Sequence, residues 1–270
     1  MDTANLVDFF CIFDEFCKYF EIELKKHVIE DSSKRHRKRK GQMSDSEIMT
    51  ILVLFHTSHF RDLKTFYLGY ICQHMRKEFP QRIHYNRFVE RQTKVALNLL
   101  LFFQTCALGK CSGISIIDST PLSSCHIKHE HNHKTMRGWA QKGKCTMGWF
   151  YGFKLHMIIN ENGEIARFCF TKGNVLDVNE LKMAERLSGM LVGDKGYISQ
   201  ELEKHLEKTL LEKRNIIETV FSQLKNWGVV NTKIRSYCGW ILNALSCLAS
   251  YVIQPFKPHL RFSKNLLIRN

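Results

Sequence analysis

Hydrophobic residues recur at helical spacing through the first 110 residues of the chain. Between Leu6 and Phe20 the apolar positions fall three or four residues apart, which predicts an amphipathic helix. Ser44 precedes a second apolar pattern and Glu47 follows three residues later, so this pair predicts a capping box at a helix start. The same spacing predicts further helices over residues 63–76 and 87–103. We therefore expect residues 1–110 to form one helical domain.

The pattern changes after residue 110, and we expect residues 111–270 to form an α/β domain. Short β-branched or apolar runs predict strands over 114–120, 149–160, 165–171 and 190–194, with a tight turn over 161–164. Helical spacing returns over 178–187 and 199–227. A strand, a hairpin, a helix, a strand and a helix in this order predict a mixed sheet flanked by helices.

The stretch from Ser236 to Phe256 contains no charged residue and is long enough to cross a bilayer. It also contains several polar residues, namely Asn243, Ser246, Ser250 and Gln254. We therefore favour a buried core helix and expect no membrane partner, with a membrane-attached basic protein as the weaker alternative.

Charge and cysteine content narrow the class of protein. The 270 residues carry a formal net charge of +14, which is unusual for a metabolic enzyme and indicates a polyanionic partner such as DNA. Seven consecutive basic residues, Lys34 to Lys40, join the first two predicted helices. Short helices with such a connector suit a helix-turn-helix-like DNA-binding region, although a plain helical bundle fits as well.

Ten cysteines without a Cys-x-x-Cys pair indicate buried, reduced thiols in a cytosolic protein.

Three acidic residues are the candidates for catalysis. Asp118 and Asp194 each end a short apolar strand, which predicts that both lie at one edge of the sheet, where ligands bind in such folds. Glu218 lies on a predicted helix, and at about 100° per residue Arg214 and Lys225 fall on the same side. Clustered carboxylates favour two Mg²⁺ or Mn²⁺ ions that catalyse phosphoryl transfer. Each acid alone could instead be a helix cap, a turn former or half of a surface ion pair.

A loop rich in histidine follows the first strand. Two cysteines and four histidines could bind zinc, but their spacing matches no regular zinc finger: Cys125, His126, His129, His131, His133 and Cys145. A loop that contacts DNA, or a solvated loop, is the favoured interpretation. Four aromatic residues flank this loop: Trp139, Trp149, Phe150 and Tyr151. They could stack on a splayed base, but we favour packing in the core.

Several motifs resemble bacterial insertion-sequence transposases of the DDE type, most closely the family named after insertion sequence 982. The resemblance covers most of the chain, and its strongest segments are Ile116–Leu122, Gly143–His156, Gly193–Tyr197 and Arg214-x3-Glu218-x6-Lys225. It implies a ribonuclease-H-like catalytic core in which Asp118, Asp194 and Glu218 bind two Mg²⁺ or Mn²⁺ ions.

The resemblance also implies the partners of the protein. These are DNA, as terminal inverted repeats and as target, and a second copy of the chain when two ends are bound. It further implies a bacterial cytoplasmic protein associated with the nucleoid. The candidate DNA contacts are Lys34, Arg35, Arg37, Lys38, Arg39, Lys40, Lys154, Lys195, Arg214 and Lys225.

The chain departs from the family pattern at two points. Leu211 occupies the position of a tyrosine, and Glu218 follows Asp194 by only 24 positions. This interval is too short for the helix, the fifth strand and the start of the last helix that the core requires. We therefore expect the fifth strand to be missing and Ser199 to Trp227 to form one long or poorly docked helix, with Glu218 far from Asp194.

Two functions follow from these observations. The first is a transposase that binds element ends and carries out metal-dependent strand cleavage and strand transfer. The second is a catalytically inactive, truncated transposase that only binds DNA. The length of the interval between Asp194 and Glu218 distinguishes these two functions, and its shortness favours the inactive protein.

Overall fold

The computed structural model divides the chain into two compact units. The first comprises Met1–Ala107 and Ile241–Ile253, and the second comprises Leu108–Trp240 and Gln254–Asn270. The first unit thus also takes in a segment that we had expected in the catalytic domain. The structure describes residues 3–27, 42–110, 113–185, 187, 189–193, 215–231 and 233–259.

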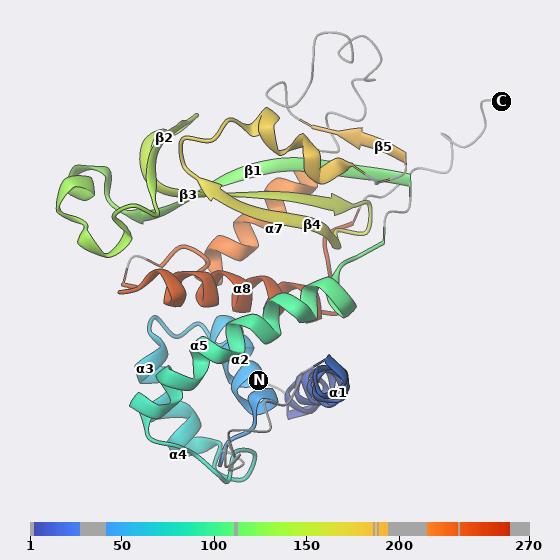
Figure 1. Cartoon of the computed structure of the whole chain (residues 1–270), viewed down its shortest axis with the longest axis vertical. Coiled ribbons are helices and arrows are strands. Elements are labelled where there is room, and N and C mark those ends of the chain that lie inside the picture. Colours follow the sequence, from blue (N-terminus) through green and yellow to red (C-terminus); the bar gives the residue numbers. More distant parts are fainter. Residues whose placement is uncertain are drawn as a thin grey trace. The chain divides into compact units, whose positions relative to one another are not determined.

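The described part of the first unit is helical, as its periodicity predicted (Figure 1). The elements are α1 (Thr3–His27), α2 (Asp45–Thr57), α3 (Leu63–Thr65), α4 (Cys72–His74) and α5 (Tyr85–Phe102). Two π-helical segments, η1 (Phe66–Ile71) and η2 (Phe103–Ala107), link α3 to α4 and extend α5. The capping box is confirmed, because the Ser44 hydroxyl accepts from the Glu47 amide and the Glu47 side chain accepts from the Ser44 amide.

Aromatic side chains join these helices into a core. Phe13 and Phe16 of α1 lie with their ring centroids 5.2 and 5.4 Å from that of Phe102. Nearly every residue of α2 is buried. This confirms the prediction that the apolar face of the first helix packs against other elements.

The uncharged segment forms α8 (Tyr237–Ile253). Its residues 241–253 belong to the helical unit, where Ser246 bonds to His56 at 2.8 Å and the Ser250 hydroxyl donates to the Val53 carbonyl at 3.1 Å. Ser246 and Ser250 are buried. The expectation of a buried core helix is therefore confirmed, and among the described residues no helix has the length and hydrophobicity needed to cross a membrane.

The second unit contains a mixed sheet in the order β2–β3–β1–β5, with β4 also paired to β3. Its strands are β1 (Gly113–Cys125), β2 (Gln141–Cys145), β3 (Gly148–Asn160), β4 (Ile165–Lys172) and β5 (Gly189–Val192). Among the described strands only β1 and β5 run parallel, with Ile116 opposite Val192, and the other pairs are antiparallel. The mixed sheet is as predicted and is compatible with a ribonuclease-H-like core.

Helical segments cover both faces of this sheet (Figure 1). On one face Ile117, Ile158 and Ala166 pack against η5 (Asp177–Ala184). On the other face lies α7 (Asn215–Asn226), whose apolar side is buried. Because successive residues of a strand point to opposite faces, Asp118 and Ser119 of β1 face different layers.

Several elements differ from the sequence prediction. The segment expected to be an α-helix over 178–187 is the short 3₁₀-helix η5. The first strand is longer than predicted and continues through Pro121. β5 pairs only with Gly113–Ile116, so among the described strands the second half of β1 has a partner on one side. Proline is tolerated at such a position because its missing N–H can face the open side.

The cysteines are less buried than expected. The described cysteines in the structure are all free. Of the cysteines that the structure describes, only Cys125 and Cys247 are buried, whereas Cys11, Cys106 and Cys238 are exposed. Burial raises the pKa of the thiols of Cys17 and Cys169 to about 12, so both are protonated at neutral pH.

Candidate active site

Asp118 is the central residue of the candidate site. Ile116 and Ile117 before it are buried and anchor β1, while Asp118 itself is half-buried. The backbone N–H of Ser119 donates to the Asp118 carboxylate at 2.7 Å. The buried residues before Asp118 thus place its carboxylate at the surface of the sheet, as the sequence indicated.

Glu218 lies in the first turn of α7. The predicted apolar face of this helix is confirmed, because Ile217, Val220, Phe221 and Leu224 are all buried. Residues 215–226 are therefore docked, contrary to the expectation of a poorly docked helix. The preceding part of the expected long helix, together with the interval in which we expect no fifth strand, falls on residues 194–214, which lie outside the described residues.

Asp118 and Glu218 line the same pocket although they are 100 positions apart in the chain. The pocket has a volume of about 400 Å³, and Lys225 of α7 lines it as well. Its remaining wall comes from β1, from α7 and from the turn between β2 and β3: Ser119, Thr120, Pro121, Cys145, Thr146, Met147, Phe221, Ser222 and Asn226.

Lys225 brings positive charge to this pocket. Removal of its ammonium group from water lowers the pKa of Lys225, and the nearby thiol of Cys145 and carboxylate of Asp118 partly oppose that shift. The side of α7 that carries Glu218 and Lys225 thus supplies both a carboxyl group and an amino group to one pocket. Such a combination suits a substrate with phosphate groups that must approach carboxylates.

The other predicted site residues are distributed differently. Asp194, Lys195, Arg214 and the basic run of residues 34–40 lie outside the described residues. Lys154, which we expected to contact DNA, is only 9% exposed. Its ammonium group donates to the Val175 carbonyl and to Asp177, both at 3.0 Å, so it points into the protein.

The hairpin of β2 and β3 presents an aromatic residue between two lysines. Trp149 is 58% exposed, and the ammonium groups of Lys142 and Lys144 lie 5.3 and 5.9 Å from the centre of its ring. Trp139 is also exposed, although its ring stacks on Tyr237. Only Phe150 of the four aromatic residues is buried, so the expectation that they pack in the core is wrong for both tryptophans.

The histidine-rich loop forms η3 (Ile127–Asn132) and η4 (Lys134–Met136). Across the residues that the structure describes, no three His, Cys, Asp or Glu side chains are grouped so as to hold a metal ion. The alternative of a zinc site in this loop therefore gains no support. Glu130 of the loop instead pairs with Lys142 of β2 at 3.2 Å.

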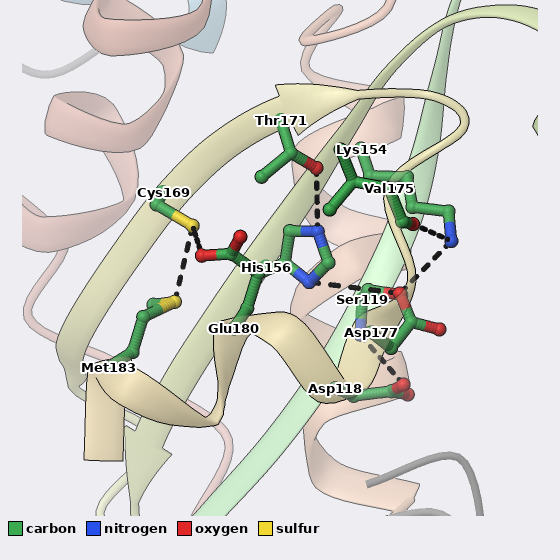
Figure 2. A network of polar contacts seen from close by, with 10 residues as sticks. All are labelled: Asp118, Ser119, Lys154, His156, Cys169, Thr171, Val175, Asp177, Glu180 and Met183. Carbon is green, nitrogen blue, oxygen red and sulfur yellow. Dashed lines mark hydrogen bonds and ion pairs between the residues drawn. The ribbon is translucent and has the colours of Figure 1, made fainter. Parts of the chain in front are cut away.

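Sequence reasoning missed a polar network behind β1, shown in Figure 2. The carboxylate of Asp177 accepts from the Ser119 hydroxyl and the Lys154 ammonium group, each at 3.0 Å. Nδ1 of the buried His156 lies 3.8 Å from the same oxygen. One signal was present in the sequence, because Lys154 and His156 alternate with apolar residues on a strand and so share a face.

The comparisons with known proteins agree with the motifs. No curated protein and no solved structure matches the chain. Residues 108–209 match the family model described as a transposase DDE domain. This range contains Asp118 and Asp194 and ends before Glu218. The central part of the chain is therefore similar to the catalytic domain of DDE transposases, and the match supports a transposase of this type.

Proposed function

We propose that the protein is an insertion-sequence transposase that binds the ends of its element and carries out metal-dependent strand cleavage and strand transfer. The observation that carries this proposal is the shared pocket of Asp118 and Glu218. A helix that held Glu218 away from the sheet would have favoured an inactive protein. The docked α7 favours the active one instead.

The register of the sheet supports Asp194 as the third acid. Ile116 of β1 pairs with Val192 of the parallel strand β5. Asp118 follows Ile116 by two positions, and Asp194 follows Val192 by two positions. Both acids thus follow the last pair of the two parallel strands by the same number of residues. We infer that Asp118, Asp194 and Glu218 form the acidic site.

The donor set of this site fits a hard divalent cation. Asp118 and Glu218 offer carboxylate oxygens, which Mg²⁺ and Mn²⁺ prefer over sulfur or nitrogen. Two such ions, held by the three acids, would polarise the scissile phosphate and activate the attacking water or 3′ hydroxyl. Lys225 would pair with a backbone phosphate in the pocket.

The hairpin of β2 and β3 would guide the DNA strand into the pocket. Its turn contributes Thr146 and Met147 to the pocket wall. Lys142, Lys144 and Trp149 on its strands offer two cations and an exposed ring to the adjacent nucleotides.

Cleavage of a DNA fragment that carries the sequence flanking the gene tests this function. With Mg²⁺ or Mn²⁺ present, we expect the full chain to cut at the element end. Replacements Asp118→Asn, Asp194→Asn and Glu218→Gln should each lower the rate by about 100-fold or more, since each removes a carboxylate ligand of the metal ions that would stabilise the transition state. The exposed Glu185, which does not line the pocket, provides the control Glu185→Gln.

DNA binding, measured by fluorescence anisotropy on the same fragment, separates the two candidate functions. If the full chain binds the fragment but no metal ion supports cleavage, the protein is the inactive DNA-binding form. Cleavage that survives in Asp118→Asn and Glu218→Gln would contradict the proposed site.

A further inference from the structure

A buried lysine and an aspartate lie on the face of the sheet opposite to α7. Lys154 of β3 is 9% exposed, and its ammonium group donates only inward, to Asp177 and to the Val175 carbonyl. Removing an ammonium ion from water is unfavourable, and the cost is offset only by a well-placed counter-charge and additional hydrogen bonds. Asp177, the first residue of η5, supplies that counter-charge.

His156 completes the network without adding charge. It is fully buried, and its Nε2 bonds to the Thr171 hydroxyl at 2.8 Å. Burial lowers the pKa of His156, which outweighs the opposite influence of Asp177 and Glu180, so the ring is neutral near pH 7. Lys154 and Asp177 therefore form the charged pair of the network, and the ring packs beside it (Figure 2).

Ser119 connects this pair to the candidate active site. Its hydroxyl donates to Asp177 at 3.0 Å, and its backbone N–H donates to the Asp118 carboxylate at 2.7 Å. One residue thus joins the charged pair on one face of the sheet to the acid at the pocket. Figure 2 shows this path from Lys154 through Asp177 and Ser119 to Asp118.

We propose that Asp177 is a positioning residue that, through Ser119, holds Asp118 in the geometry for binding a divalent cation. The buried pair fixes Asp177, Asp177 fixes the Ser119 side chain, and the Ser119 amide orients the Asp118 carboxylate. Outer contacts of this kind orient metal ligands in other metalloproteins. The inference rests on the proposed function, because it gives Asp118 the role of a metal ligand.

Two variants and a matched control test the proposal in the full chain. Ser119→Ala removes only the hydroxyl that reaches Asp177. The double replacement Lys154→Met with Asp177→Asn removes both charges together and leaves no unpaired buried ion. Ser123→Ala makes the same chemical change as Ser119→Ala four residues further along β1, outside the network.

The first measurement is the hydrogen exchange of the amide at position 119 in metal-free protein, resolved by NMR. Both test variants should exchange this amide several-fold faster than the unmodified protein, and the control should not. The second is a calorimetric titration with Mn²⁺ alone. Both test variants should bind Mn²⁺ about 10-fold more weakly, while the control keeps the original affinity.

Two results would overturn the inference. In the first, both test variants unfold at lower temperature but keep the original amide exchange and Mn²⁺ affinity. The network would then only stabilise the fold. The other is that the unmodified chain binds no Mn²⁺ and that the amide of residue 119 exchanges at the same rate in the test variants as in the unmodified chain. Failure of the unmodified chain to bind Mn²⁺ counts against the proposed function, whereas the exchange measurement decides separately whether Asp177 holds this segment.

Discussion

Lys154 and His156 show how the surroundings decide what a charged or polar residue does. Both lie in a strand whose other residues are mostly apolar, and either could have faced DNA. In the structure both are buried on the side of the sheet that η5 covers. Their alternation indicates a shared face, but only the placement of Asp177, which follows in the chain by more than 20 residues, gives that face its partner.

His156 makes stability depend on pH in a defined direction. Because burial lowers the pKa of His156 below its ordinary value of 6.5, the unfolded chain binds this proton more readily than the folded chain. The free energy of unfolding should therefore fall as the pH drops below about 6.5. The charged groups that face the ring are Asp177, Glu180 and Lys154.

Thermal unfolding at pH 7.5 and at pH 5.5 (about one unit on either side of the unfolded-state pKa) measures this effect. The unmodified protein should lose more stability at the lower pH than a His156→Gln variant does, because glutamine does not titrate. An equal loss in the two proteins would show that other groups cause the pH dependence.

Lys225 should contribute one phosphate contact to DNA binding. Replacement by methionine keeps the length of the side chain and removes its charge, so affinity for a DNA end should fall. The slope of log affinity against log salt concentration should decrease by about 1. Lys225→Arg keeps the charge and should retain most of the slope. A slope that is the same in Lys225→Met and in the unmodified protein would place this ammonium group away from phosphate.

At the scale of elements, the sequence predicted the helices and strands that have a strong local pattern of apolar or capping residues. The apolar face of α7 and the capping box of α2 could be predicted because residues close in the chain determine them. β2 could not, because its sequence Gln-Lys-Gly-Lys-Cys has no alternation of apolar residues. This strand depends on distant partners: a Cβ at Gly143 would lie 2.0 Å from the Gly173 carbonyl oxygen.

The docking of α7 could not be predicted for the same reason. Helical propensity continues without interruption from Ser199 to Trp227, so local preference gave no indication that residues 215–226 would dock on the sheet. Burial of Ile217, Val220 and Phe221 is a tertiary effect. Such packing decides most of the stability of a helix in a protein, and here it brings Glu218 to the pocket of Asp118.

The hairpin of β2 and β3 should bind unpaired nucleotides through Trp149. Stacking of a base on an exposed ring contributes roughly 1–3 kcal/mol, so Trp149→Ala should weaken binding of a DNA end with a single-stranded overhang by about 5-fold or more. Binding of a fully paired end should change little. Trp139→Ala is the control, because Trp139 is similarly exposed but already stacks on Tyr237.

Fluorescence anisotropy with the two kinds of DNA end measures the difference. Equal weakening by Trp149→Ala and Trp139→Ala would indicate a general effect on the fold. An unchanged affinity of Trp149→Ala for the overhang would remove this residue from the DNA path.

At the scale of the whole molecule, basic residues that pair with acids of the protein differ from basic residues that we assign to DNA binding. The net charge of +14 already counts every acid, including those of the pocket and of the surface ion pairs, so basic residues remain in excess. Lys18 and Lys26 on α1 pair with Asp14 and Glu23, whereas seven consecutive basic residues follow that helix without an acid among them. A dense run of this kind is suited to the backbone of DNA, where each neutralised phosphate releases condensed counterions.

DNA affinity should therefore fall steeply as salt concentration rises. Replacement of six residues by alanine should reduce the slope of log affinity against log salt by as much as about 5, since each phosphate contact contributes roughly 0.9. These residues are Lys34, Arg35, Arg37, Lys38, Arg39 and Lys40. The double variant Lys18→Ala with Lys26→Ala also lowers the net charge, but it removes lysines that already have acidic partners. It should leave the slope nearly unchanged, because counterion release depends on contacts with phosphate and not on net charge alone. A shallow slope in the unmodified protein, or an equal reduction in both variants, would contradict the assignment of this run to DNA.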